Sequence, residues 1–225
     1  MRTVADGVFE VRLGYVNAHF VVVDDGVVLV DSGLPGRSAT VEQALHEARR
    51  KLGDVHTILL THRHPDHVGN AADLRNRSGA RVVAHAADAP AITGAETVTP
   101  TGLMRVLALF VKPPEPVPVD ETLQADGPLP VPGFSAVHTP GHTAGHVSYL
   151  LDRADGVLFV GDAAGGGRHR KVRRSPRMMT EDTAAAEASV ARLAALEFQV
   201  AVFGHGRAIT GGAVDRFREY HTRNA

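Results

Sequence analysis

Four potential metal ligands lie within six consecutive positions of the sequence, at His62, His64, Asp66 and His67. The apolar run before them is typical of a strand, and His62 and His64 lie two residues apart at its end, so both imidazoles can point to the same side. Pro65 fixes its own φ and biases His64 away from helix, which predicts a turn that presents the second pair. Imidazole and carboxylate ligands suit zinc, and also iron, manganese or cobalt. The stretch indicates a metal site, with a polar surface loop as the alternative.

Three later segments follow the same design, in which a polar residue comes after a predicted strand and beside glycine or proline. They are residues 139–146, 160–162 and 204–206, and they contain His142, Asp162 and His205. Glycine at such positions permits tight turns and a close approach of the backbone to a site. His138 and His146 flank His142 and are possible competitors for its role.

With its His-x-His-x-Asp-His loop, Pro-Gly-His-Thr segment, Gly-Asp and Gly-His-Gly in this order, the chain resembles the metallo-β-lactamase superfamily over almost its whole length. The resemblance implies seven metal ligands around two divalent ions, with zinc expected and iron or manganese as alternatives. The first ion would be held by His62, His64 and His142, the second by Asp66, His67 and His205, and both by Asp162. It places the ligand at His142 and not at its neighbours. Asp31, in an Asp-Ser-Gly turn, matches an early acidic residue that orients the ligands.

The chemistry that this resemblance implies is hydrolysis of an ester, thioester or lactone by a hydroxide that bridges the two ions. Metal ions about 3.5 to 4 Å apart lower the pKa of bound water and stabilise the developing anion. Asp66 and Asp162 are the expected catalytic carboxylates, because either can orient the nucleophile or relay its proton. A mononuclear iron enzyme of the persulfide dioxygenase branch, using His62, His142 and Asp162, is one alternative. A phosphodiesterase or nuclease of the same superfamily is another.

Two features of the sequence differ from better-known members of the superfamily and limit the activities that we expect. The chain has no Cys, so it lacks the thiolate ligand of some β-lactamases, and its two aspartates are more similar to glyoxalase II and lactonase relatives. The sequence stops about twenty residues after His205, which predicts that the helical C-terminal domain of glyoxalase II, with its glutathione recognition, is missing.

Composition describes an ordinary globular protein. The 225 residues are 44% hydrophobic and carry a net charge of −1, so nothing suggests a nucleic-acid partner. The first ten residues contain acidic groups and lack a signal-peptide core, and no stretch approaches the ~20 apolar residues that span a bilayer. We expect a single cytoplasmic domain over residues 1–225 with a small-molecule substrate and no membrane partner.

The elements that must position these ligands can be expected in two halves of strands followed by helices. Strands are expected at 7–14, 17–23, 27–31, 55–61 and 81–84, and again at 134–139, 147–152, 156–160 and 199–203. Helices are expected from a capping box at Thr40 and Gln43 to Gly53, at 70–77, from an N-cap at Thr180 to Leu193, and at 211–221. This alternation, with the resemblance, predicts an α/β (α+β) fold: the four-layer αββα sandwich.

Two segments have no clear place in that pattern. Residues 86–124 form a Pro-rich, apolar insertion, whose run at 103–111 is either a core or homodimer-interface helix or a hydrophobic wall over the site. Six cations lie between residues 168 and 177, and Arg173 and Arg174 are candidate contacts for an anionic substrate. The bland alternative is a solvated basic loop.

Overall fold

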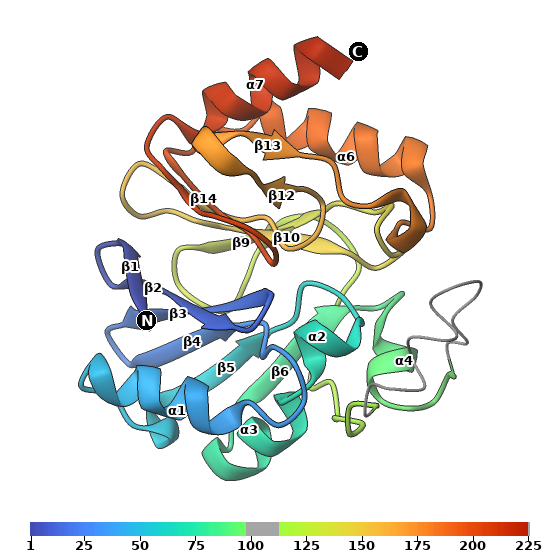
Figure 1. Cartoon of the computed structure of the whole chain (residues 1–225). Helices are drawn as coiled ribbons and strands as arrows, with labels where there is room; N and C mark the ends of the chain where they lie inside the picture. The colour runs from blue at the N-terminus through green and yellow to red at the C-terminus, as the bar shows by residue number, and fades with distance from the viewer. Residues whose placement is uncertain (98–112, 225) are drawn as a thin grey trace.

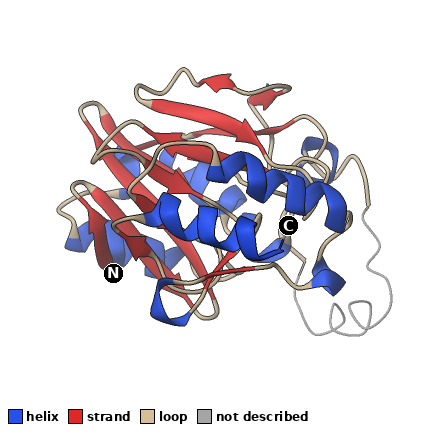
Figure 2. Ribbon diagram, turned by 90° about the horizontal axis from the view of Figure 1, so that it is seen from above, coloured by secondary structure: helices blue, strands red, loops and turns tan. Residues whose placement is uncertain are grey.

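The structure, a computed structural model that describes residues 1–97 and 113–224, is built from two facing β-sheets with helices on the outer face of each. Figure 1 shows α1 (Ser38–Glu47) and α3 (Ala71–Ser78) outside one sheet and α6 (Thr183–Ala194) and α7 (Ala213–Asn224) outside the other. The view from above in Figure 2 shows the same stacking of helices over strands. The predicted αββα sandwich is therefore confirmed.

The first sheet has seven strands in sequence order, and its second half is parallel. The first four strands form an antiparallel meander, and the fourth to seventh pair in parallel through helical crossovers. Because parallel strands end at one edge, the loops after them meet there. The strands are β1 (Arg2–Ala5), β2 (Val8–Leu13), β3 (Val16–Val23), β4 (Gly26–Val30), β5 (Val55–Leu59), β6 (Arg81–His85) and β7 (Glu121–Leu123).

The second sheet has six strands in the order β15-β14-β11-β10-β9-β8. Its neighbours are antiparallel except β11 and β14, which run parallel and so deliver the loops after them to the same edge. A separate pair of short strands, β12 (Gly165–Gly166) and β13 (Val172–Arg173), follows β11. The strands of the sheet are β8 (Gly127–Pro128), β9 (Phe134–His138), β10 (Val147–Leu151), β11 (Val157–Phe159), β14 (Val200–Val202) and β15 (Ile209–Thr210).

Three clusters of buried apolar side chains lie between the four layers of helices and sheets and stabilise the sandwich. In β11, Phe159 packs between the two sheets, whereas Leu158 faces the layer that contains Leu193 and Phe217 from the helices. In β4, Val28 likewise faces the other sheet and its neighbours face α1 and α3. Strands with both faces buried need continuous apolar runs instead of alternation, which is the pattern that the sequence shows. Among the described residues, no helix is long and apolar enough to cross a membrane.

Two helix starts differ from the sequence prediction. The helix α1 begins at Ser38 and has no side-chain cap of its own, so the predicted capping box at Thr40 and Gln43 is wrong. The distant Asn70 Oδ1 accepts a hydrogen bond from the backbone of Arg37 instead, at 2.8 Å. The helix α6 is capped by Asp182, whose Oδ1 accepts from two backbone N–H groups at 2.9 Å, and not by Thr180.

Other boundaries of helices and loops also differ from those predicted from the sequence. The helix α1 ends at Glu47, and a short 3-10 turn, Leu52–Asp54, lies where its continuation to Gly53 was predicted. The insertion at 86–124 is not wholly irregular, since it contains α4 (Ala89–Ile92) and the edge strand β7, which pairs with β6. The predicted apolar run at 103–111 lies outside the described residues.

Candidate metal centre

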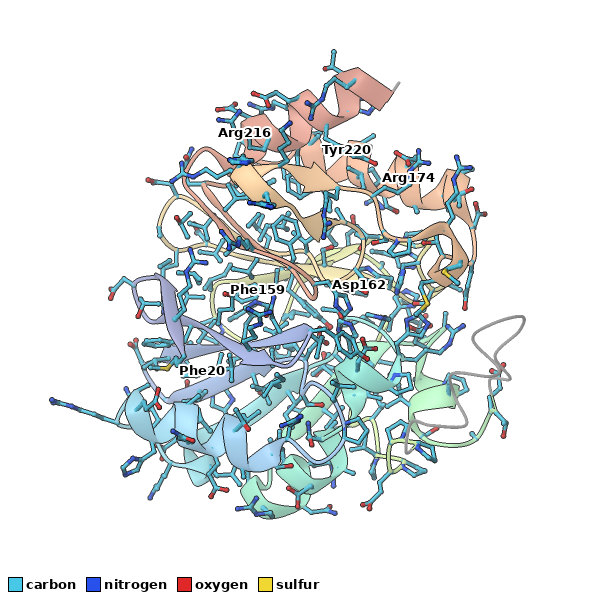
Figure 3. The ribbon with its side chains drawn as sticks, in the orientation of Figure 1. Phe20, Phe159, Asp162, Arg174, Arg216 and Tyr220 are labelled. Atoms are coloured by element: carbon cyan, nitrogen blue, oxygen red, sulfur yellow. The ribbon has the colours of Figure 1, made fainter. Side chains whose placement is uncertain are left out.

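The predicted ligands lie in loops at the carboxyl-terminal ends of strands in both sheets. His62 and His64 follow β5, and Pro65 opens the single-turn helix α2 (Pro65–Val68), which carries Asp66 and His67. From the second half, His142 lies between β9 and β10, Asp162 follows β11 and His205 follows β14. Figure 3 shows Asp162 between the two layers of strands. All seven candidates are therefore supplied by the edge where the two sheets meet.

Three histidine nitrogens converge in the first group. The Nε2 atom of His62 lies 3.1 Å from Nδ1 of His64, and Nε2 of His142 lies 2.9 Å from the same atom. These three residues form one of the groups in the described chain that could hold a metal ion. A single imidazole N–H cannot bond well to two nitrogens at once, so this crowding of nitrogens calls for a shared cation.

Asp66, His67 and His205 form a second group, and Asp162 lies between the two. The Nε2 atom of His205 is 3.3 Å from Oδ2 of Asp66 and 3.2 Å from Oδ2 of Asp162. The same Asp162 carboxylate lies 3.5 Å from Nε2 of His67 and 3.5 Å from Nε2 of His142. Asp162 thus lies within 3.5 Å of members of both predicted ligand sets.

The separations of 3.2 to 3.5 Å around Asp162 fit metal coordination better than hydrogen bonding, whereas the nitrogens at His64 lie closer together, at 2.9 and 3.1 Å. A tetrahedral ion with metal–nitrogen bonds of about 2.0 to 2.1 Å holds its ligand atoms about 3.3 to 3.4 Å apart. In addition, Nε2 of His67 and Oδ1 of Asp162 are buried and have no hydrogen-bond partner. Buried polar atoms are normally satisfied, so two unsatisfied atoms facing each other in this cluster fit a cation held between them.

The histidines of the two ligand groups have pKa values shifted in opposite directions. Burial lowers the pKa of His62 well below its ordinary value and that of His142 to about 3, so both rings are neutral bases at pH 7. Burial alone would lower the pKa of His67 and His205, but the charges of the nearby aspartates, Asp162 foremost, raise the first well above its ordinary value, and hydrogen bonds to Asp162 and Asp66 raise the second to about 10. Burial would likewise raise the pKa of Asp66, yet His67 and His205 lower it to about 2.

Asp31 orients two of the candidate ligands. Its carboxylate accepts hydrogen bonds from the backbone N–H of Thr61 at 2.8 Å and from the Thr61 hydroxyl, and it lies 2.8 Å from Nδ1 of His67. The Thr61 hydroxyl is also 3.0 Å from Nδ1 of His62. With Nδ1–H committed in both rings, Nε2 of His62 presents a lone pair to the cluster, and Nε2 of His67 would do so once its own proton has left, which is the usual arrangement of metal-binding histidine.

The family model described as the metallo-beta-lactamase superfamily matches residues 11–205. The chain belongs to the metallo-β-lactamase superfamily. A probable metallo-hydrolase of Bacillus subtilis, YflN, is 31% identical over 235 aligned residues, which cover 92% of this chain and 86% of that relative. A hydroxyacylglutathione hydrolase of Albidiferax ferrireducens is 35% identical over 150 residues, 64% of this chain and 49% of the relative. The chain thus spans about half the length of that hydrolase.

Solved structures of the superfamily share the fold. A metallo-β-lactamase from Cronobacter sakazakii, a variant of its HARLDQ motif, superposes with a TM-score of 0.78 at 22% identity, covering 99% of this chain and 94% of that one. A metallo-β-lactamase family protein from Thermus thermophilus gives 0.72 at 28% identity, covering 99% and 80%. The sandwich extends over nearly the whole chain in both comparisons.

Some residues of this superfamily member that hold the cluster were not singled out from the sequence. Nε2 of His146 accepts a hydrogen bond from the backbone N–H of Asp162 at 2.9 Å, and Nδ1 of His146 lies 2.8 Å from the Thr139 hydroxyl. The carboxamide of Asn17 donates to the carbonyls of Phe203 and Gly206, each at 3.0 Å. His146 had a visible signal in its motif, whereas Asn17 is one polar residue in an apolar strand.

Glycine is required where the loop after β14 approaches the cluster. A Cβ atom on Gly204 would lie 2.3 Å from Oδ1 of Asp162 and 2.5 Å from Cε1 of His67. Real Cβ atoms do not come so close to other heavy atoms, so any larger residue here would displace a candidate ligand. The Gly-His-Gly pattern therefore serves the site as well as the turn.

The two predicted arginines lie in and directly after β13, the strand that follows Asp162 in the chain. Arg174 forms an ion pair with Glu187 of α6 at 2.5 Å, and Figure 3 shows it beside Tyr220 near α7. This ion pair gives the Arg174 guanidinium a partner within the chain, and its role in a substrate funnel stays a prediction. Arg173 is exposed in β13, where its stem lies beside Gly167.

An exposed aromatic residue lies at the cluster instead. The ring of Tyr15, in the turn between β2 and β3, is 62% exposed and stacks on His205 with 5.7 Å between ring centroids. Its backbone carbonyl is 3.0 Å from Nδ1 of His205. Burial and the charge of Asp66 raise the pKa of the Tyr15 hydroxyl, so it stays protonated as a hydrogen-bond donor.

Proposed function

We propose that this member of the metallo-β-lactamase superfamily is a hydrolase that uses two divalent metal ions, zinc in the first place, to cleave an ester, thioester or lactone. The observation that carries the proposal is the pair of ligand groups that meet at Asp162, with separations of 2.9 to 3.5 Å between candidate ligand atoms. The separations around Asp162 are close to the ~3.3 to 3.4 Å that a tetrahedral ion requires, and the nitrogens of the first group lie slightly closer together.

The ligand assignment follows the two groups. One ion would be held by His62, His64 and His142, the other by Asp66, His67 and His205, and both by Asp162. Each ion would then have four protein ligands, and an ion that expands to five-coordinate would keep a position for water, as catalytic zinc can. When bound, such ions lower the pKa of water and polarise the oxygen of the bond to be cleaved.

The chain's own side chains supply the remaining chemistry. Asp66 and Asp162 are held as carboxylates, since the pKa of the first is about 2 and that of the second lies well below its ordinary value. Each can therefore accept a hydrogen bond from the attacking water and fix its direction, and can pass its proton toward the leaving group. Burial of Asp162 excludes bulk water from this side of the cluster.

The substrate would approach the cluster at His205, whose side chain is 31% exposed and stacks on the ring of Tyr15. An aromatic ring that is mostly exposed beside a buried polar cluster can cover the apolar part of a substrate, while its hydroxyl donates to an oxygen. Arg173, exposed in the loop after Asp162, remains a candidate contact for an anionic substrate. The relatives named hydroxyacylglutathione hydrolase support thioesters as the first substrates to test.

The test is metal quantification on protein purified without added metal, followed by a screen of lactones, thioesters, phosphodiesters and persulfides. Two ions per chain with turnover of a carboxylic ester, thioester or lactone would support the proposal. One iron per chain with oxygen uptake on a persulfide would instead establish the dioxygenase that the sequence left as an alternative. His142→Ala should abolish the activity, and a variant that keeps full turnover of every substrate would refute the assignment.

A further inference from the structure

Arg63 lies between two proposed ligands, yet its side chain turns away from them. Its Nη1 donates to Oδ1 of Asp88 at 2.5 Å, its Nη2 donates to Oε1 of Glu181, and its backbone N–H donates to Oδ2 of Asp88 at 3.0 Å. The Arg63 side chain is only 12% exposed. A guanidinium that is largely buried between two carboxylates has no freedom to act as a substrate contact, so its role must be sought in what it joins.

Asp88, the residue before α4, joins the two halves of the chain. It is fully buried, and its carboxylate accepts four hydrogen bonds. Besides the two from Arg63, the Thr143 hydroxyl donates to Oδ2 at 2.7 Å and the Gly145 backbone N–H donates to Oδ1 at 3.1 Å. A Cβ atom on Gly145 would lie 2.7 Å from Oδ1 of Asp88, so the glycine allows this contact. A buried carboxylate is tolerated only when it is satisfied in this way.

Glu181 holds the same loop from its other side. Its carboxylate accepts from the backbone N–H of Ala144 at 3.1 Å, while its own backbone N–H donates to the carbonyl of His142 at 3.3 Å. The next residue, Asp182, donates its N–H to the carbonyl of Gly141 at 2.9 Å and caps α6. The loop 141–145 is thus fixed between two carboxylates that share one arginine.

We propose that Asp88, Arg63 and Glu181 form a clamp that positions His142 against His62 and His64. The inference rests on the proposed metal site, because the clamp sets the spacing of the three nitrogens of the first group. Its members bond to the backbone and side chains of the two loops and not to those nitrogens, so they are positioning residues. The first group draws its ligands from both halves of the chain, and the clamp bonds these halves directly beside the ligands.

The experiment compares Asp88→Asn with Asp120→Asn as a matched control. Asp120 also pairs with an arginine, Arg75, at 2.8 Å and also accepts a backbone N–H, that of Val82, at 2.8 Å, but it lies outside the site. Both variants are made in the wild-type chain and in a His205→Ala background, where the remaining ion reports the first group. The measurements are the rate of zinc release to a chromophoric chelator, the visible spectrum with cobalt, and denaturant unfolding without metal.

Loss of the clamp should speed release of the ion held by the first group by about tenfold to a hundredfold, the usual effect of removing a residue that orients metal ligands. The cobalt spectrum should change with it, and release of the other ion should keep its wild-type rate. Arg63→Lys, which keeps the charge but not the paired geometry, should give a smaller acceleration. Asp120→Asn should leave zinc release and the cobalt spectrum unchanged.

Unfolding at lower denaturant with unchanged zinc release and spectrum would show that Asp88 only stabilises the fold, and would overturn the clamp. If Asp88→Asn does not fold, Thr143→Val removes one of the four hydrogen bonds with little change in shape, and zinc release at the wild-type rate in that variant would overturn the clamp too. A wild-type chain that binds no metal would instead refute the proposed function itself, and this inference would fall with it.

Discussion

Metal loading should release protons from one ligand group and not from the other. In the metal-free chain, Asp66 and Asp162 raise the pKa of both His67 and His205, and Asp31 raises that of His67 as well. The His205 value of about 10 means that this ring carries a proton at pH 7, and the same holds for His67, whose pKa is raised well above its ordinary value. A divalent ion must displace both protons to reach the Nε2 atoms.

The magnitude follows from charge balance. Binding at the second group should release about two protons at pH 7, because two imidazolium charges are exchanged for one divalent ion. Its affinity should therefore rise by about a hundredfold per pH unit, tenfold for each proton, until the pH reaches the lower of the two pKa values. The first group should release no protons when it binds a metal ion, since burial lowers the pKa of His142 to about 3 and also lowers that of His62.

The assay is isothermal titration calorimetry of the metal-free chain with zinc in buffers of different ionisation enthalpy at pH 7. The slope of observed enthalpy against buffer enthalpy gives the protons released at each step. His205→Ala should lower the total by about one proton, whereas His64→Ala should not change it. Equal proton release at the two steps, or affinity at the second group that does not rise with pH, would refute the charge assignment.

Three substitutions test other parts of the account. Asp31→Asn should speed release of the ion held by His67 by about tenfold to a hundredfold in a chelator assay, because Nδ1–H of His67 loses a charged acceptor; wild-type release would contradict this. Tyr15→Ala should raise KM by up to about tenfold, given about 0.5 to 1.5 kcal/mol for an aromatic contact, with kcat unchanged; an unchanged KM would remove Tyr15 from the substrate site. Phe159→Ala should lower the free energy of unfolding by about 3 to 5 kcal/mol in urea, since the ring is fully buried between the sheets, and a loss below about 1 kcal/mol would refute that packing.

The sequence predicts best what is local. His62 to His67 lie within six residues, the apolar runs that become β11 and β14 are continuous, and β5 ends in the apolar pair Ile58 and Leu59, so the ligands and the central strands are visible without long-range information. Their assembly in one αββα sandwich was predicted from the two halves of strands followed by helices together with the family resemblance. The convergence of His142 on His64, 78 residues apart in the chain, could be expected only from that source.

What the sequence could not predict depends on partners distant along the chain. Asp88 forms hydrogen bonds with residues that are 25 and 57 positions away in the sequence, and Asn17 with a residue 189 positions away. The residues next to Asp88 and Asn17 in the sequence give no indication of these partners. The start of α1 was misplaced for the same reason, because its first turn is satisfied by Asn70 and not by a local capping box. The ion pair of Arg174 with Glu187 was likewise not visible from the sequence, because the two residues are thirteen positions apart.

The central claim is that two ligand groups sharing Asp162 hold two ions. Its most direct test is the number of metal ions per chain, measured by elemental mass spectrometry on wild type, His64→Ala and His205→Ala at equal protein concentration. The account predicts two ions in the wild type and one in each variant, with different cobalt spectra because a different group is left. One ion in the wild type that both variants retain, or that both lose, would contradict it.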